Sequence, residues 1–200
     1  MTRSPKNGII TTEVTGRMNG GGTTAMLDDL YGRRSIRKYK STKIEKETVQ
    51  LLLKAALLSP SSKGLRPWSF IVVDDAEILK QLSNTKKGAA HLKNAALGIV
   101  ICADPTISDV WVEDASIAAT ILHLTANSLG LGSCWIQIRE RQYTETETAE
   151  QYVQEILGIP KNLRVVAIMA IGYPDEFKSA YTDNELKFER VHLNQYGSIY

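Results

Sequence analysis

The stretch Tyr31-Gly32-Arg33-Arg34-Ser35-Ile36-Arg37-Lys38-Tyr39 is the part of this chain around which the rest is organised. Three arginines, a serine and a lysine fall within six of its positions, and no acidic residue lies among them. Guanidinium groups are planar, permanently charged forks that match phosphate oxygens two at a time, and a serine hydroxyl adds a further donor. The stretch therefore predicts a binding site for a doubly charged anion. A solvated basic face or a contact with nucleic acid would have the same composition.

Length and composition indicate a soluble globular protein. The chain has 200 residues, of which 43% are hydrophobic and 23% charged, so it is long enough to form a substantial core. Its net charge is only +2, so the basic stretch is a local feature and no overall field draws the chain to nucleic acid or to a membrane. No apolar run reaches transmembrane length, and the start of the chain lacks the apolar core of a signal peptide. A cytoplasmic protein is therefore expected.

The cysteines and histidines predict no metal site and no catalytic triad. Cys102 and Cys134 are flanked by apolar or small residues and have no Cys or His neighbour at metal-ligand spacing. A disulfide framework is not expected from two such cysteines. His91, His123 and His192 stand in no catalytic arrangement, and His123 is expected to be an interior residue whose hydrogen bonds are satisfied.

The beginning of the chain is polar and includes Asn19-Gly20-Gly21-Gly22. Residues 1–23 are expected to be a tail, a tag or an arm over a partner subunit, and residues 24–200 a single domain. A first helix is predicted over Ala25–Arg33 with Thr24 as its N-cap. The apolar residues expected on the inner face of this helix are Met26, Leu27 and Leu30.

Hydrophobic periodicity and helix breakers predict the other elements. Thr42-x-x-Glu45 is interpreted as a capping box before a helix that stops at Ser59-Pro60. The apolar stripe of that helix is expected to be Val49, Leu52, Leu53, Ala56 and Leu57. Further helices are predicted over residues 76–83, 86–94, 110–129 and 146–157. Strands are predicted over residues 70–73, 97–103, 133–138 and 164–171. Single strands interspersed among helices indicate one sheet, in an α+β or α/β fold.

The helix predicted over residues 110–129 is apolar nearly all round. A helix of this kind lies inside a large core or inside a subunit interface. Because a 200-residue chain has a core of limited size, a homodimer whose interface includes this helix is predicted.

Four short motifs, in this order and at these spacings, resemble those of the FMN-dependent nitroreductase family from Leu27 to the C-terminus. They are Arg33-Arg34-Ser35-Ile36-Arg37, Ser59-Pro60-Ser61-Ser62 with Arg66-Pro67-Trp68, Leu129-Gly130-Leu131-Gly132, and Gly172-Tyr173-Pro174. The resemblance implies an α+β, nitroreductase-like fold, with a central mixed, mostly antiparallel sheet flanked by helices in an intertwined homodimer. It also implies FMN held at the dimer interface, with NADH or NADPH as electron donor.

The resemblance assigns one end of the flavin to the basic stretch. The residues implied to contact its phosphate and ribityl chain are Arg33, Arg34 and Ser35. Lys187 or Arg190, near the C-terminus, would join the phosphate. Arg37 would lie near the pyrimidine side of the ring, where its fixed charge favours the negatively charged reduced flavin. Because the flavin carries the redox chemistry, Arg37 is expected to tune the cofactor, and no catalytic acid or base is assigned.

The remaining flavin contacts would come from the partner subunit and from one strand. The partner would supply Pro60-Ser61-Ser62 with Gly64, and Cys134-Trp135-Ile136-Gln137 would lie along the ring. Arg66 is also expected among the cofactor-binding residues. Some relatives carry Asn at the position of Gly64, Gln at that of Arg66, an acidic residue at that of Gln137, and a lysine near His91. These departures affect hydrogen bonding to the ring and what occupies its open face.

The sequence favours an oxidoreductase that takes hydride from NADH or NADPH and reduces a nitroaromatic, a quinone or a similar flat acceptor in a ping-pong cycle. A flavin-binding module without turnover, acting in storage, sensing or partner binding, is an alternative from another class. A nucleic-acid binder that uses residues 33–40 is a third hypothesis, although the chain lacks a second basic stripe and a series of stacking aromatics. The family also has dehalogenating and flavin-degrading members.

Overall fold

The structure is a computed structural model that describes residues 25–200, so the predicted tail over residues 1–23 and the predicted N-cap Thr24 lie outside the described residues. Its centre is a four-stranded sheet in which each strand is antiparallel to its neighbours. The strand order is β1-β2-β4-β3, for β1 (Trp68–Val73), β2 (Leu97–Ala103), β3 (Gly132–Gln137) and β4 (Arg164–Gly172). The predicted mostly antiparallel sheet is confirmed. Within the described residues, parallel pairing is confined to an isolated bridge between Ser35 and Ser133.

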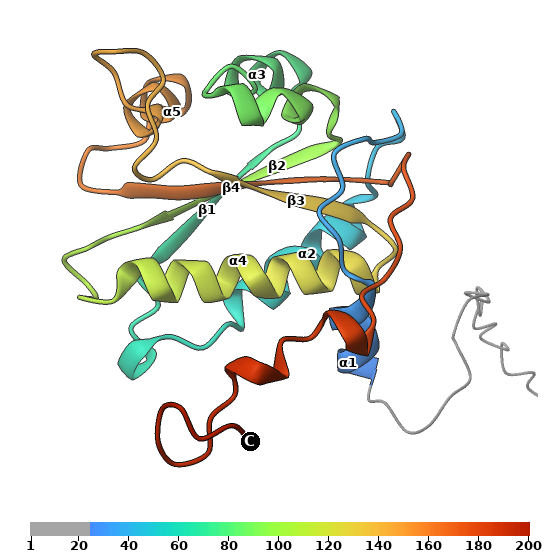
Figure 1. Cartoon of the computed structure of the whole chain (residues 1–200). Coiled ribbons are helices and arrows are strands. Elements are labelled where there is room, and N and C mark those ends of the chain that lie inside the picture. Colours follow the sequence, from blue (N-terminus) through green and yellow to red (C-terminus); the bar gives the residue numbers. More distant parts are fainter. Residues whose placement is uncertain (1–24) are drawn as a thin grey trace, which may run out of the picture.

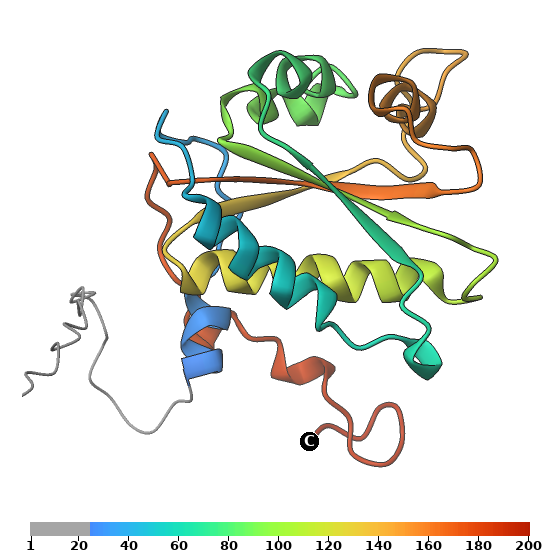
Figure 2. The ribbon, with the colours of Figure 1, turned by 180° about the vertical axis from the view of Figure 1, so that it is seen from behind.

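Helices cover both faces of the sheet (Figure 1; Figure 2). One face carries α3 (Ala76–Leu82), the 3-10 helix η2 (Lys87–Asn94) and α5 (Ala149–Leu157). The opposite face carries α2 (Lys46–Leu57) and α4 (Trp111–Ser128). Each layer encloses its own apolar core. Strands β2 and β4 lie between the two cores, which explains why these central strands are apolar at nearly every position.

The shorter elements lie outside these layers. Helix α1 (Ala25–Gly32) sits beside the C-terminal end of α4, and the 3-10 turn η1 (Ser62–Gly64) lies near the other end of α4 (Figure 1). After β4 the chain returns past α1 and runs along the side of α4 that faces away from the sheet, through η3 (Asp183–Glu185) and η4 (Phe188–Arg190). No helix within residues 25–200 is long and apolar enough to cross a membrane.

The start of α5 follows the sequence rules for helix capping, whereas the start of α2 does not. Helix α5 begins with a capping box in which the Thr148 hydroxyl accepts from the Gln151 N–H and the Gln151 side chain accepts from the Thr148 N–H. It ends at Gly158, whose φ of 63° suits glycine. The capping box predicted at Thr42-x-x-Glu45 is wrong, because α2 begins one residue after Glu45 and no side chain caps it.

The face predicted to be buried in α1 is exposed. Met26 is 67% exposed, and Leu27 and Leu30 are also exposed, so α1 buries none of its residues against the rest of this chain. The apolar stripe of α2 is buried at Leu52 and Ala56, but Leu57 at its end is exposed. These apolar side chains remain accessible to another surface.

Helix α4 has the extent that its sequence predicted, and it is covered on one side. Five alanines and leucines of its inner face are fully buried: Ala115, Ala118, Ala119, Leu122 and Ala126. On its other side Ile117 is 40% exposed, while Ile121 and Leu124 are half-buried. One chain therefore does not cover the whole apolar circumference of the helix.

Candidate functional site

The basic stretch crosses the ends of β3 and β4 at close range. The Ile36 N–H donates to Ser133 O at 3.0 Å, and the Lys40 N–H donates to Tyr173 O at 2.9 Å. Two glycines make this approach possible, because a Cβ at Gly132 would lie 2.7 Å from Ile36 and a Cβ at Gly172 would lie 2.9 Å from the Tyr39 ring. The glycines of two sequence motifs thus serve the same purpose: they let the basic stretch lie against the sheet.

Tyr39 anchors the far end of the stretch. Its ring is buried, and its hydroxyl donates to Ile36 O at 2.5 Å and lies 3.3 Å from Ala170 O. Burial raises the pKa of Tyr39 far above its ordinary value, so the hydroxyl stays protonated and keeps donating. The stretch between Arg33 and Tyr39 is therefore held at both of its ends.

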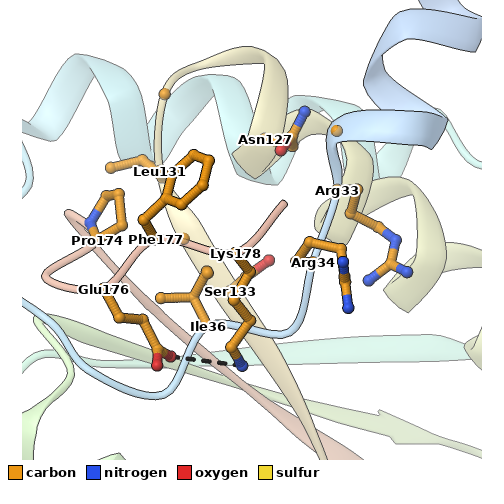
Figure 3. A pocket seen from close by; sticks show the side chains of 13 residues that line it. Arg33, Arg34, Ile36, Asn127, Leu131, Ser133, Pro174, Glu176, Phe177 and Lys178 are labelled. Carbon is orange, nitrogen blue, oxygen red and sulfur yellow. Dashed lines mark ion pairs between the residues drawn. The ribbon is translucent and has the colours of Figure 1, made fainter. Parts of the chain in front are cut away.

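A cavity of about 230 Å³ opens where this stretch meets β3 and the segment after β4. Arg33 and Arg34 lie on one side of it, whereas Leu131, Pro174 and Phe177 gather on the other (Figure 3). The remaining lining residues are Gly32, Ile36, Asn127, Gly130, Gly132, Ser133, Glu176 and Lys178. The cavity therefore combines a cationic wall with an apolar wall.

Arg33 is oriented by a histidine of α4. Its Nη1 lies 2.9 Å from Nε2 of His123, and Nδ1 of His123 contacts the Ser133 hydroxyl. A guanidinium group only donates, so Nε2 accepts and the proton of the neutral ring is on Nδ1. Burial and the charge of Arg33 lower the pKa of His123 to about 4. The predicted hydrogen bonds of His123 are confirmed, but the residue is half-buried and not fully interior. Its neutrality leaves the positive charge of Arg33 uncompensated.

Arg34 is oriented by the segment after β4. Its Nη1 donates to the Ser179 carbonyl, and its guanidinium carbon lies 4.4 Å from the centre of the Tyr181 ring. Neither contact neutralises the guanidinium, since one partner is a carbonyl and the other an aromatic face. Within residues 25–200, neither Arg33 nor Arg34 forms an ion pair.

Lys178 is a third cation at this cavity, and the sequence analysis did not identify it. Its ammonium group donates to Ser35 O. It also lies 3.6 Å from the Glu176 carboxylate, in the ion pair that Figure 3 marks with a dashed line. Glu176 also accepts from the N–H of Arg37 at 2.5 Å and from that of Lys38 at 3.3 Å. The Arg37 N–H and Lys178 lower the pKa of Glu176, which therefore stays ionised. A lysine in an irregular segment carries no periodic signal, so only the folded chain identifies it.

Arg37 shares the Ser35 carbonyl with Lys178 as a hydrogen-bond acceptor but forms no ion pair among the described residues. Its side chain is exposed, and its nearest hydrogen-bond acceptor is Ser35 O at 3.5 Å. His91 of η2 is half-buried, and its Nε2 is buried without a hydrogen-bond partner in the described part of the chain. Burial and the charge of Arg37 lower the pKa of His91. The guanidinium of Arg37 is thus available to a bound group.

The predicted strand segment alternates between the two faces of β3. Cys134 and Ile136 are buried, whereas Trp135 and Gln137 are half-buried. Burial raises the pKa of Cys134, so its thiol stays protonated. The Gln137 side chain accepts from Trp135 Nε1 at 2.9 Å and donates to Arg139 O at 2.8 Å. Any contact of Cys134 or Ile136 with a ligand would therefore use their backbone atoms.

The predicted loop residues Pro60, Ser61, Ser62, Gly64 and Arg66 do not line the cavity. The Ser62 N–H donates to Asp114 in the first turn of α4, whereas Arg33 contacts His123 in its second half. Asp114 and His123 are nine residues apart, which is about 13 Å along a helix axis. Within one chain, the loop and the basic stretch therefore form separate surfaces.

Lys187 and Arg190 also lie outside the cavity lining. Both are exposed residues of the C-terminal tail, at the start and at the end of η4. Among the described residues, Lys178 is the lysine that lines the cavity together with Arg33 and Arg34, and a phosphate contact from Lys187 or Arg190 stays a prediction. Asp114 was missed as well, although a signal existed: it lies four residues before Ala118 and so falls on the apolar face of its helix.

The residues present suit a ligand with an anionic end and a flat apolar part. Arg33, Arg34 and Lys178 offer charged donors, and the Ser133 and Asn127 side chains add polar atoms. Leu131 and Phe177 supply apolar surface on the opposite wall. A phosphate-bearing aromatic cofactor has this chemistry.

Comparisons with known proteins identify the family of this chain. The Nitroreductase family profile matches residues 30–106 and 79–173. A protein from Archaeoglobus fulgidus with the provisional name NADH dehydrogenase/NAD(P)H nitroreductase is 39% identical over 175 residues, which are 85% of this chain and 98% of the relative. The solved FMN-dependent nitroreductase from Clostridium difficile R20291 is 53% identical, with a TM-score of 0.84, over 85% of this chain and 99% of that one.

A more distant structure shares the same fold. The NADPH:FMN oxidoreductase from Vibrio harveyi, solved in complex with NAD+, is 27% identical, with a TM-score of 0.72, over 88% of this chain and 79% of that one. The sequence match, the fold and the cationic cavity agree, and we conclude that this chain belongs to the nitroreductase family.

Proposed function

We propose that this protein is an FMN-dependent oxidoreductase that uses NADH or NADPH to reduce a nitroaromatic, a quinone or a similar flat acceptor. One observation carries the proposal: Arg33 and Arg34 face an apolar wall across a cavity whose lining also includes Lys178. Membership of the family makes the protein an oxidoreductase. FMN, when bound, supplies the hydride and electron chemistry.

The basic stretch would hold the phosphate. Arg33 and Arg34 have no acidic partner among residues 25–200, so their charges are available to a dianion. The neutral His123 and the Tyr181 ring orient these guanidinium groups without cancelling them. Each arginine is therefore pre-organised, which lowers the entropy lost when a phosphate binds. The exposed guanidinium of Arg37 would lie at the ring.

The complete site would require two chains. The loop containing Ser62 and the basic stretch lie at different ends of α4, so one chain cannot close a single pocket with both. A homodimer would bring the loop of one protomer to the cavity of the other. The exposed apolar residues of α1, Ile117 of α4, and the tail residue Tyr196, which is 95% exposed, would then be covered.

The visible spectrum of the purified protein tests the proposal. Bound oxidised flavin should absorb in the visible range, and NADH or NADPH should bleach that absorbance, with re-oxidation on addition of a quinone. Parallel double-reciprocal lines would support the ping-pong cycle. Protein without flavin that also fails to take up added FMN would refute the assignment. Flavin that is bound but not bleached by either nucleotide would favour a binding module without turnover.

A further inference from the structure

Asp114 is a buried acidic residue in the first turn of α4, with 2% of its surface exposed. Its Oδ1 accepts a 2.8 Å hydrogen bond from the Ser62 N–H, and its Oδ2 accepts a 2.7 Å hydrogen bond from the Ser108 hydroxyl. No basic side chain in the described part of the chain forms an ion pair with it. A buried carboxyl group is tolerated only when its oxygens are bonded, so these two contacts explain its position.

The loop that Asp114 holds has a strained backbone. The backbone φ angles of Lys63 and Arg66 are 51° and 50°, in the left-handed region that residues other than glycine rarely adopt. Gly64, between them, has a φ of 68°. Ser61 supports this shape from within the loop, since its carbonyl accepts from the Gly64 N–H and its hydroxyl accepts from the Arg66 N–H at 2.9 Å. Strain of this kind persists only where the surrounding contacts impose it.

Packing within one chain does not account for the strain. Residues 63–66 are all exposed, so the unusual backbone buries no side chain of its own. Among the described residues, the hydrogen bond from the Ser62 N–H to Asp114 is the one that joins residues 61–66 to α4. The loop is exposed, its backbone is strained, and the buried Asp114 holds it in place. Such a loop is suited to form a contact surface whose shape exists before the ligand binds.

We propose that Asp114 is a positioning residue for flavin binding, because it fixes the shape in which the loop around Ser62 meets the cofactor held by the other subunit. The inference rests on the proposed function, which brings this loop to the partner's cavity. Asp114 lies beneath the loop and acts only through it. Its side-chain length matters, because one oxygen must reach Ser62 while the other reaches Ser108.

Hydrogen exchange and flavin affinity together test this role. Asp114→Ala removes the acceptor of the Ser62 N–H, so amides of residues 61–66 should exchange about tenfold faster in the cofactor-free protein. The Kd for added FMN, measured by quenching of flavin fluorescence, should rise about tenfold. Asp114→Asn should restore both values, because its amide oxygen can accept from Ser62 while its NH₂ donates to the Ser108 oxygen.

Ser108→Ala is the matched comparison, because it removes the donor to Oδ2 of Asp114 and keeps Oδ1 as the acceptor of the Ser62 N–H. The unpaired Oδ2 should lower the free energy of unfolding, but the exchange of residues 61–66 and the Kd should change much less than in Asp114→Ala. If Asp114→Ala does not fold, Asp114→Ser replaces it, since a serine hydroxyl is too short to reach Ser62. The inference is overturned if loop exchange in the variant equals that of the wild type, or if Ser108→Ala has the same effects. Wild-type protein that binds no FMN would refute the proposed function instead, while the exchange rates still test the contact.

Discussion

At the scale of single residues, the contact between Arg33 and His123 pairs a permanently charged guanidinium with an imidazole that becomes a cation when it is protonated. The histidine accepts from the guanidinium only while it is neutral. A proton on its second nitrogen would place two positive charges against each other in a half-buried site. The contact therefore links the orientation of Arg33 to pH.

Acid should destabilise the fold through His123. Its folded-state pKa is lowered to about 4, below the ordinary value of 6.5, so the unfolded chain binds a proton first as the pH falls. The free energy of unfolding should therefore decrease between pH 6.5 and 4, by about 2–3 kcal/mol from this group. His123→Gln keeps an acceptor for Arg33 and a donor for Ser133 but does not titrate. Urea unfolding at about pH 7 and about pH 4.5 should show a smaller loss in that variant, and identical losses would contradict the assignment.

Loss of either arginine should weaken FMN binding more than it weakens the fold. Arg33→Ala or Arg34→Ala each removes a charge-assisted contact worth about 1.5–3 kcal/mol, which corresponds to a ten- to hundredfold rise in Kd. Flavin retained through gel filtration measures the effect. Lys40→Ala is the control, since Lys40 is an exposed cation of the same segment that does not line the cavity. Stoichiometric flavin in both arginine variants would show that the basic stretch is a solvated face.

Arg37 should affect the reactivity of the flavin more than its binding. Arg37→Ala removes a cation that forms no ion pair within residues 25–200, while the residues that would hold the phosphate remain. The reduction potential should fall because negative charge on the reduced flavin loses its partner. Reduction by NAD(P)H should slow by a factor on the order of a hundred. Stopped-flow reduction and a redox titration measure both, with Arg37→Lys as the variant that retains the charge. An unchanged potential and rate would show that Arg37 points elsewhere.

At the scale of elements, glycines at the ends of β3 and β4 leave room for the basic stretch to pack against the sheet. Glycine at the first position of β3 and at the last position of β4 removes the side chains that would push Ile36 and Tyr39 away. The main-chain bonds from the stretch to Ser133 and Tyr173 form only at this distance. The orientation of Arg33 follows, since Ser133 also contacts His123.

Alanine at either glycine should destabilise the protein. The added Cβ of Gly132→Ala or Gly172→Ala would meet Ile36 or Tyr39 below 3.0 Å, and overpacking of this kind costs about 1–3 kcal/mol. Gly32→Ala is the control, because its Cβ would lie 3.7 Å from Asn127, an ordinary contact. Chemical denaturation measures all three variants. Equal stability of the control and the two test variants would mean that the basic stretch does not need this close approach.

At the scale of the whole molecule, one chain leaves large apolar side chains of α1 and of the C-terminal tail exposed. The α1 residues Met26, Leu27 and Leu30 and the tail residues Tyr196 and Tyr200 are exposed. Obligate interfaces bury on the order of 2,000 Å² or more and resemble a core cut in half. A second copy of the chain would cover these groups and complete the proposed site.

Sedimentation should therefore give about twice the 22.2 kDa of one chain. Mixed dimers can then show whether the site is shared. In a dimer of one Arg33→Ala chain with one Ser62→Trp chain, a shared arrangement places both changes in one site and leaves the other site intact. When equal amounts are mixed, about a quarter of the total flavin capacity should return, because about half of the dimers are mixed and each of these has one intact site, although each parent dimer binds poorly. A stable flavin-loaded monomer, or no recovery on mixing, would refute the shared site.

The sequence by itself determined the elements and the nature of the ligand. Helix α4, strands β2 and β4 and the C-terminal end of α5 are predicted from three sequence features: the spacing of apolar residues, continuous apolar runs and a glycine after the helix. Each of these features involves only a few neighbouring residues. The basic stretch indicated an anion because its charges are adjacent in the chain. The family resemblance rested on motifs that are equally local.

The tertiary structure decided which groups meet. Lys178 and His123 join the basic stretch across more than eighty residues of sequence, and Asp114 reaches Ser62 across 52. No local pattern encodes such pairings, because they depend on how the layers pack. The exposed face of α1 was mispredicted for the same reason. Amphipathic periodicity indicates that a face is apolar, but only the folded chain shows whether its own residues or another surface must cover it.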